Sequence, residues 1–385
     1  MSGVRKFTLG EIGPVRMCKR IMKDETSPDG EIPFFKIGTF GGKADVFISR
    51  ERYEEYKSKY PYPKRGDVLI SAAGTIGRLV VFDGRESYFQ DSNIVWVEND
   101  EAKVTNACLY YALQLARWKP SQGSTILRLY NDDIRAVEFF APESLSDQGR
   151  VASILSAIDR KIALNWKRIA TLEAMAKEIY DYWFVQFDFP DAHGRPYKSS
   201  GGAMVYNPDL KREIPKGWEV VPLGELISVC NGKDHKALLV GDIPVYGSGG
   251  IMRRVDQMLY EGESVLIPRK GTLNNIMYVN GPLWCIDTMF YTKPKVDNVM
   301  KYIFMTIKDW DFASMDTGSA VPSMTAGIIN KLSVARPADV FLEKFENQMR
   351  ALFVEMSLSE REIAKLTSLR SFLLPLLMNG QAKVR

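Results

Sequence analysis

An internal duplication is the feature that most constrains the fold of this 385-residue chain. Leu69–Thr75 reads LISAAGT and returns as LIPRKGT at Leu266–Thr272, 197 residues later (266 − 69). Gly123-Ser124-Thr125 returns as Gly318-Ser319-Ala320, 195 residues later (318 − 123). Each copy then runs into a long segment with heptad spacing, so the period describes a globular unit followed by a long helix. Two such units can place similar heads on a two-fold-like target, and duplex DNA is the commonest target of that kind.

The two copies differ in length. The offset between matching residues falls from 214 (Leu223 against Leu9) to 197 at the LISAAGT pattern, so the first copy holds roughly 14 to 17 extra residues between Phe47 and Arg65. This stretch contains the charged run Arg50–Lys57, which we expect to be helical. Repeats usually diverge in surface elements of this kind.

Each copy is predicted to be a mixed α+β unit. Short apolar runs bounded by turn residues predict strands, and apolar residues at helical spacing predict one helix before each Gly-Ser pattern. The expected strands are 68–70, 79–82 and 94–97 in the first copy and 265–267, 276–279 and 289–291 in the second; the expected helices are 109–118 and 299–310.

Two long segments have apolar residues spaced alternately by three and four, which is typical of coiled coils. The first seam is Val151, Leu155, Ile158, Ile162, Asn165, Ile169, Leu172, Ala176, Ile179 and Trp183. The second seam is Leu342, Phe345, Met349, Leu352, Met356, Ser359, Ile363, Leu366, Arg370, Leu373 and Leu377.

The simplest partner for each seam is the other. Asn165 and Ser359 lie near the middle of their seams, which favours an antiparallel coiled coil with Asn165 close to Ser359, since a lone polar core residue can fix register. The Gly/Ser/Pro-rich stretch 190–216 predicts an irregular connector. Within it Tyr206–Asp209 is expected to be a turn, as is the glycine-rich Gly247–Gly250 further on.

The composition argues against catalysis by this chain. It has two histidines, His193 and His235, and four scattered cysteines without a C-x-x-C pair, so zinc sites, disulfides and histidine-based catalytic sites are not expected. No P-loop pattern, signal peptide or membrane span is present, and we expect a cytoplasmic protein. A net charge of +4 permits a nucleic-acid partner without requiring one.

A family resemblance is carried by three features: the duplicated unit, the run Tyr182–Pro190 (YWFVQFDFP) that closes the first helix, and the run Ile214–Glu225 (IPKGWEVVPLGE) that enters the second unit. Together they closely resemble the specificity subunit of type I restriction-modification systems, over essentially the whole chain.

The resemblance implies a fold with two pseudo-repeated α/β target-recognition domains separated by two long helices in an antiparallel coiled coil. The domains would span residues 1–145 and 216–338, the spacer helices 146–187 and 339–380, and the connector 188–215. The chain itself would be non-catalytic and would bind no cofactor. S-adenosylmethionine, ATP and magnesium would be used by two methyltransferase (M) subunits and by restriction (R) subunits, which would assemble with it on double-stranded DNA for phage defence.

Candidate DNA contacts are hydrogen-bonding or cationic side chains on the predicted loops. They are Lys36, Lys43, Ser71, Thr75, Arg78, Ser124 and Arg128 in the first unit, and Lys233, His235, Lys236, Arg253, Arg254, Arg269, Lys270, Thr272 and Asn274 in the second. Ala72-Ala73 corresponds to Arg269-Lys270, so we expect different half-sites and an asymmetric target.

Helices of about 35 residues would span roughly 50 Å at ~1.5 Å per residue, enough to hold two domains about one DNA turn apart. Three other functions remain open at this point: a nuclease or methyltransferase fused to recognition domains, a DNA-binding regulator without methyltransferase partners, and a coiled-coil scaffold.

Overall fold

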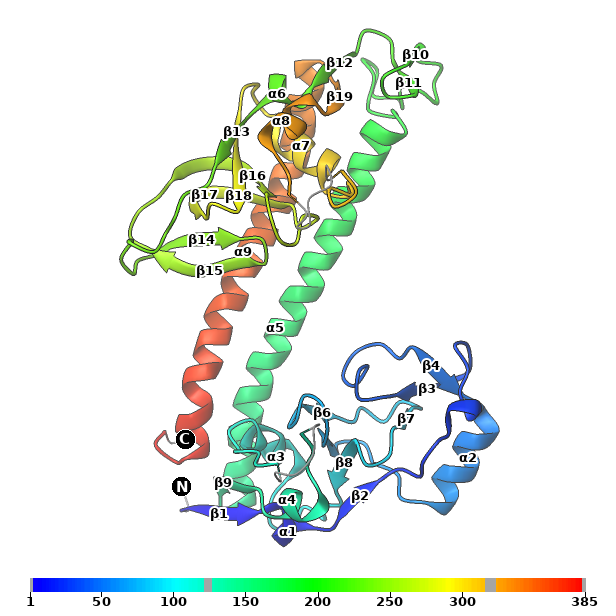
Figure 1. Ribbon diagram of the computed structural model, residues 1–385, viewed down its shortest axis with the longest axis vertical. Coiled ribbons are helices and arrows are strands. Elements are labelled where there is room, and N and C mark those ends of the chain that lie inside the picture. The colour runs from blue at the N-terminus through cyan, green and yellow to red at the C-terminus, as the bar shows by residue number, and fades with distance from the viewer. Residues whose placement is uncertain (1–2, 121–126, 316–322, 383–385) are drawn as a thin grey trace. The chain divides into compact units, whose positions relative to one another are not determined.

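The computed structural model describes residues 3–120, 127–315 and 323–382 (Figure 1). The chain divides into two compact units. The first comprises Met1–Asn165 and Arg361–Arg385, and the second comprises Trp166–Glu360. Each unit therefore holds one globular domain and a part of both long helices.

The first globular domain contains small sheets and short helices. A four-stranded sheet has the order β2-β8-β5-β6, a three-stranded sheet has the order β4-β3-β7, and β1 pairs with β9. The strands are β1 Val4–Thr8, β2 Val15–Met17, β3 Ile32–Phe35, β4 Val46–Ile48, β5 Val68–Ser71, β6 Leu79–Val81, β7 Tyr88–Phe89, β8 Ile94–Val97 and β9 Glu138–Pro142. The helices are α1 Leu9–Ile12, the 3-10 turn η1 Lys23–Glu25, α2 Arg50–Lys59, α3 Asn106–Leu113 and α4 Asn131–Arg135.

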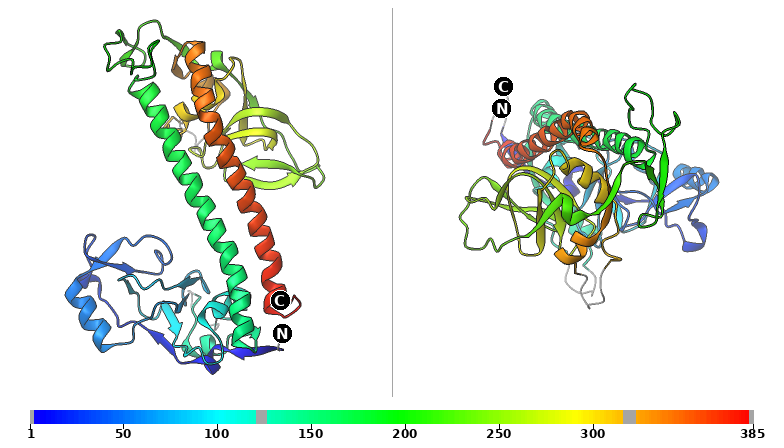
Figure 2. Two further views of the ribbon diagram at one scale, coloured as in Figure 1. Left: turned by 180° about the vertical axis from the view of Figure 1, so that it is seen from behind. Right: turned by 90° about the horizontal axis from the view of Figure 1, so that it is seen from above.

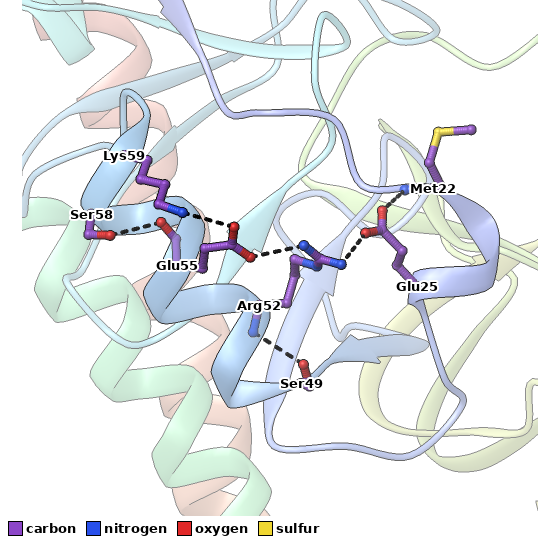
Figure 3. A network of polar contacts seen from close by, with 7 residues as sticks. All are labelled: Met22, Glu25, Ser49, Arg52, Glu55, Ser58 and Lys59. Carbon is purple, nitrogen blue, oxygen red and sulfur yellow. Dashed lines mark hydrogen bonds and ion pairs between the residues drawn. The ribbon is translucent and has the colours of Figure 1, made fainter.

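Helix α2 is the extra segment of the first copy, and it is helical as its charged sequence predicted. Ser49 caps its start, accepting a hydrogen bond from the Arg52 backbone N–H at 3.2 Å. The Arg52 guanidinium lies between Glu25 and Glu55 (Figure 3), and each ion pair measures 2.9 Å. Beneath this polar surface the buried Tyr53 ring packs edge-on against Tyr62. The helix is thus attached to the domain through one ionic and one aromatic face.

The second globular domain has one six-stranded sheet of order β13-β18-β16-β17-β14-β15 and the pair β12-β19. Its strands are β12 Glu219–Pro222, β13 Ile227–Asn231, β14 Ile243–Gly247, β15 Gly250–Val255, β16 Tyr260–Pro268, β17 Met277–Cys285, β18 Met289–Pro294 and β19 Ser333–Arg336. Its helices are α6 Leu223–Leu226, α7 Met300–Ile307 and α8 Ala326–Lys331.

The duplication seen in the sequence is a duplication of backbone pairing. In the first unit β1 pairs antiparallel with β9, and the Leu9 N–H donates to the Val137 carbonyl at 3.0 Å. In the second unit β12 pairs antiparallel with β19, and the Leu223 N–H donates to the Leu332 carbonyl at 2.7 Å. Likewise β3 runs parallel to β7 as β14 runs parallel to the end of β17. The prediction of two α+β repeats is therefore confirmed.

The long segments are α5, Leu145–Tyr180, and α9, Asp339–Met378. Their portions run antiparallel within each unit. In the first unit Asp159 pairs with Arg370 and Asn165 with Glu362. The residue number on α5 therefore rises as that of its partner on α9 falls. In the second unit Arg168 pairs with Glu355.

Further along the second unit the Trp183 and Phe345 rings lie 5.9 Å apart, so the end of α5 meets the start of α9 there, as Figure 2 also shows. The predicted antiparallel pairing is confirmed. Burial agrees with the seams, because Leu155, Ile158 and Ile169 on α5 are buried, as are Phe345 and Met349 on α9.

Two polar residues of the seams, Asn165 and Ser359, each form a hydrogen bond to a glutamate of α9. The Asn165 side chain donates to the Glu362 carboxylate at 2.8 Å. The Ser359 hydroxyl donates to the Glu355 backbone carbonyl of its own helix at 2.8 Å. Both side chains are buried and satisfied in this way. The proximity of Asn165 to Ser359, which belong to different units, stays a prediction.

Each globular domain shares its hydrophobic core with both helices. In the first unit, Val151 and Leu155 of α5 and Leu374 and Leu377 of α9 belong to the same buried cluster as the strands. In the second unit, Ala176 and Trp183 join Leu342, Phe345 and Met349 in a corresponding cluster. Each domain is therefore packed on segments of both helices.

The connector is more regular than predicted. Residues 204–215 form a hairpin of β10, Met204–Asn207, and β11, Arg212–Pro215. The expected turn at Tyr206–Asp209 is its reversal, where the Asn207 side-chain oxygen accepts from the Asp209 and Leu210 N–H groups. The first spacer helix also ends in a π-helical turn, Asp181–Val185, rather than as continuous α-helix.

Candidate nucleic-acid interface

In the first unit the repeated LISAAGT pattern forms the end of β5 and the tight turn into β6. Ser71 is buried, and its hydroxyl accepts a hydrogen bond from the Arg78 N–H at 2.8 Å and donates to the Thr75 carbonyl. Gly77 has a φ of +77°, and a Cβ there would lie 2.5 Å from the Trp118 ring. The Ser71 hydroxyl therefore stabilises the turn from inside, and DNA contact by Ser71 stays a prediction.

The second unit builds its turn on the same backbone framework. Ala72 follows β5, and Arg269 follows β16. In each unit the N–H of this residue donates to the carbonyl just before β8 or β18, and its carbonyl accepts from the N–H of a later loop residue. The four bonds are Ala72 N to Asn93 O at 2.7 Å, Leu129 N to Ala72 O at 2.7 Å, Arg269 N to Thr288 O at 2.8 Å and Met324 N to Arg269 O at 2.9 Å. The two turns therefore share these two backbone hydrogen bonds.

The side chains on this shared framework differ. Ala72 and Ala73 are buried, whereas Arg269 and Lys270 at the corresponding positions are exposed. Among the described residues neither cation has an ion pair or a side-chain hydrogen bond. Thr272 is exposed beside them. The two cationic side chains of this turn are thus available to a binding partner, and the phosphate groups of DNA are suitable.

Three predicted cations of the first unit are engaged with the protein. Arg78 donates to the Phe40 carbonyl at 3.0 Å, and Arg128 donates to the Ser92 carbonyl at 3.0 Å. Lys36 pairs with Asp45 at 3.1 Å on the surface. These side chains hold loops together, which the sequence pattern did not reveal. Lys43 and Thr75 are exposed, and Ser124 lies outside the described residues.

Two predicted arginines of the second unit also bind carbonyl groups. Arg253 donates to the Leu238 carbonyl at 2.9 Å and Arg254 to the Asp242 carbonyl at 2.6 Å. They join the β14–β15 hairpin to the preceding loop, so at least part of their hydrogen-bonding capacity serves the fold.

Asn274 joins the candidate turn to a neighbouring loop. Its amide donates to the Asp311 carboxylate at 3.0 Å, and its oxygen accepts from the Ala313 N–H at 3.1 Å. The hydrogen bond from Asn274 holds the pKa of Asp311 below its usual range. Asn274 therefore links the two loops, and the DNA contact predicted for it stays a prediction.

The remaining predicted residues lie on the loop after β13. Lys233 and Lys236 are exposed, with no side-chain partner among the described residues. His235 is half-buried, and its Nδ1 atom is buried without a hydrogen-bond partner in the part of the chain that is described. The Trp284 indole donates to the Lys233 carbonyl at 2.9 Å and fixes the start of this loop on the sheet.

One neighbour of the turn was not identified from the sequence. The Ser248 carbonyl, at the tip of the β14–β15 hairpin, accepts from the Asn275 amide at 2.7 Å. Gly271 has a φ of +86°, and a Cβ there would lie 2.6 Å from the Ser248 hydroxyl. The glycine-rich run Gly247–Gly250 is a turn, as expected, but only the structure shows that it borders the Arg269-Lys270 turn.

Within the described ranges, no group of three His, Cys, Asp or Glu side chains could hold a metal ion, and the four cysteines are free thiols. No helix in those ranges is long and apolar enough to cross a bilayer.

Comparison with known proteins identifies the family. The model of the type I restriction modification DNA specificity domain matches residues 1–174 and 215–339, which is most of the chain and both copies of the repeat. The chain belongs to the type I restriction-modification specificity family. Members of this family are specificity subunits, which agrees with the resemblance noted in the sequence.

The similar proteins carry the same description. A type I restriction enzyme specificity subunit of Haemophilus influenzae is 57% identical over 151 residues, and this match spans 39% of each chain. The MjaIX specificity subunit of Methanocaldococcus jannaschii is 23% identical over 92% of this chain and 88% of its own length. The crystal structure of the S subunit from M. genitalium aligns with a TM-score of 0.65 at 17% identity, covering 100% of this chain and 97% of that one, and so shares the fold.

Proposed function

We propose that this chain reads a bipartite, asymmetric DNA sequence for a type I restriction-modification complex, with one half-site read by each globular unit. The observation that carries the proposal is the pair of equivalent turns. Their backbones share two hydrogen bonds, yet one turn has buried alanines where the other has the exposed Arg269 and Lys270. Equal scaffolds with unequal side chains suit two different half-sites.

The lengths of the two antiparallel helices suit the proposed spacing between the half-sites. α5 has 36 residues and α9 has 40, and a helix of that length extends for roughly 50 to 60 Å at ~1.5 Å per residue. One turn of B-DNA extends about 34 Å. A pair of helices of this length can thus separate two readers by about one turn of the duplex.

We further propose that the helices dock two methyltransferase subunits at equivalent places. Leu164 on α5 and Leu358 on α9 are 62% and 51% exposed, and Met175 and Leu369 are also exposed. Both pairs are related by the same offset of 194 residues (358 − 164 and 369 − 175). Large exposed apolar side chains that recur at equivalent positions are suited to binding two copies of one partner.

In this proposal the chain is a binding subunit. Methyl transfer from S-adenosylmethionine belongs to the M subunits, and ATP- and magnesium-dependent translocation and cleavage belong to the R subunits. The chain contributes the choice of sequence and the geometry of assembly.

Co-expression with the cognate M subunit, followed by mapping of methylated bases across the host genome, tests the proposal. We expect one split motif with a fixed gap and two different halves. DNA binding with no co-purifying methyltransferase and no methylated motif would instead identify a stand-alone DNA-binding regulator.

A further inference from the structure

The β14–β15 hairpin of the second unit exposes two large apolar side chains in succession. Ile251 and Met252 are 56% and 57% exposed. β15 is the last strand of the six-stranded sheet, so no other strand in the described part of the chain covers its outer edge (Figure 1). Exposed neighbours of this size at a sheet edge are a liability unless they have a partner.

A β-bulge places these side chains. Tyr246 is opposite Ile251, and Val245 is opposite Arg253, so Met252 is the extra residue on β15. The bulge interrupts the alternation of side chains between the two faces, and bulges commonly re-aim side chains next to functional sites. Gly247 leaves room for Met252, because a Cβ at Gly247 would lie 2.5 Å from the Met252 sulfur.

The same hairpin tip adjoins the cationic turn. Ser248 accepts the hydrogen bond from Asn275 and lies against Gly271, two residues from Arg269. The apolar pair and the two free cations therefore belong to neighbouring loops on one domain. A surface of this composition is complementary to an anion-bearing partner that also offers apolar groups.

The first unit has no equivalent apolar pair at this place. Its β3–β4 connection carries Lys36 and the exposed Lys43, and Ile37, which packs against the Gly74 turn, is only partly exposed. The apolar hairpin is a difference between the two readers rather than a requirement of the fold.

We propose that Ile251 and Met252 contact thymine methyl groups in the major groove of the half-site read by the second unit, while Arg269 and Lys270 contact flanking phosphates. This inference rests on the proposed function. The major groove admits a two-stranded β-ribbon, and the thymine methyl is the apolar group that base pairs present there. The hairpin thereby becomes a specificity determinant of the second unit.

The test uses the complex of this chain with its M subunits and duplexes carrying the methylated motif. Each thymine of the motif is replaced in turn by deoxyuridine, which removes the 5-methyl group alone. We expect the wild-type complex to lose affinity, on the order of tenfold for full loss of the apolar contact, at one or two thymines of one half-site. The I251S/M252S complex should bind the unmodified duplex about as weakly, and deoxyuridine at those positions should weaken it no further.

The matched control is L239S/V240S, which removes two apolar side chains that are 71% and 87% exposed in the loop that precedes β14. Its affinity and its response to deoxyuridine should match the wild type. Unchanged binding by I251S/M252S, or undiminished sensitivity to deoxyuridine in that variant, overturns the thymine assignment. If the wild-type complex methylates no split motif, the proposed function itself fails, and this result is distinct because it precedes any variant.

Discussion

The Arg370 guanidinium donates to the Asp159 carboxylate at 2.5 Å, although Arg370 occupies a position in the heptad seam where an apolar residue is expected. It also donates to the Gln114 side chain at 2.6 Å, and the Tyr111 hydroxyl donates to Asp159 at 2.8 Å. Burial raises the pKa of Tyr111 above its ordinary value, so the phenol remains a donor. The polar exception in the seam thus joins α9 and α5 to helix α3 of the first globular domain.

Replacing Asp159 by Ala should destabilise the first unit by about 1 to 3 kcal/mol, because Arg370 and Tyr111 would lose their shared acceptor in a half-buried site. Glu355→Ala removes the partner of Arg168 at an exposed position and should cost less than about 1 kcal/mol. Urea unfolding of both variants gives the two free energies, and equal losses would contradict the special role of Asp159.

The four thiols should differ sharply in reactivity. Burial raises the pKa of Cys18, Cys108 and Cys285 to about 12, whereas Cys230 is only half-buried. At pH 8 a maleimide should label Cys230 first and the other three only on unfolding, since the thiolate is the reactive form. Mass spectrometry of labelled peptides identifies the order.

The same three thiols predict a dependence of stability on pH. Their pKa is raised in the folded state from the ordinary 9.0, so their contribution is fully present below about pH 9 and is lost as the pH rises towards about 12. Replacing Cys108 by Ser should reduce the slope of unfolding free energy against pH in this window. A slope identical to that of the wild type would contradict the assignment.

The R269A/K270A complex should bind specific and unrelated duplexes more weakly to a similar degree. Loss of two phosphate contacts should lower the slope of log affinity against log salt by about 1.8, at ~0.9 per contact. Arg78→Ala is the control, because Arg78 binds the Phe40 carbonyl and should not change the slope. A slope unchanged in R269A/K270A would exclude phosphate contact.

Docking of two M subunits at equivalent places predicts loss of one copy at a time. Leu164→Asp and Leu358→Asp should each yield complexes with a single M subunit, and the double variant should yield none. Tyr206→Asp, at an exposed residue of the connector hairpin, should leave two. Native mass spectrometry reports the stoichiometry, and retention of both copies by the double variant would exclude this docking surface.

Insertion of one heptad into both α5 and α9, at matched places near Asn165 and Ser359, should move the two domains apart by roughly 10 Å. The gap in the methylated motif should then lengthen by about 3 base pairs at ~3.4 Å per step. Methylation mapping measures the gap directly. An unchanged gap with intact methylation would refute the role of the helices as a spacer.

Patterns that repeat along the chain predicted most of the fold. The heptad spacing predicted both long helices, because a buried stripe on a helix requires apolar residues at regular intervals. Polar residues interrupt the seams at Asn165, Ser359 and Arg370. The site was less predictable. Arg78, Arg128 and Arg253 have the residue type expected of DNA contacts, but their acceptors are carbonyl groups distant in sequence. No local pattern distinguishes such an arginine from a free one.

Two ion pairs of the helices are images of one another. Lys161 pairs with Glu362 in the first unit, and Arg168 pairs with Glu355 in the second. An offset of 194 residues carries Lys161 onto Glu355 and Arg168 onto Glu362. An interface that maps onto itself in this way is the hallmark of a symmetric homodimer. In these helix contacts the chain resembles a dimer of two half-length chains joined by one peptide linker, so the sequence of either globular domain can differ without altering the ion pairs between α5 and α9.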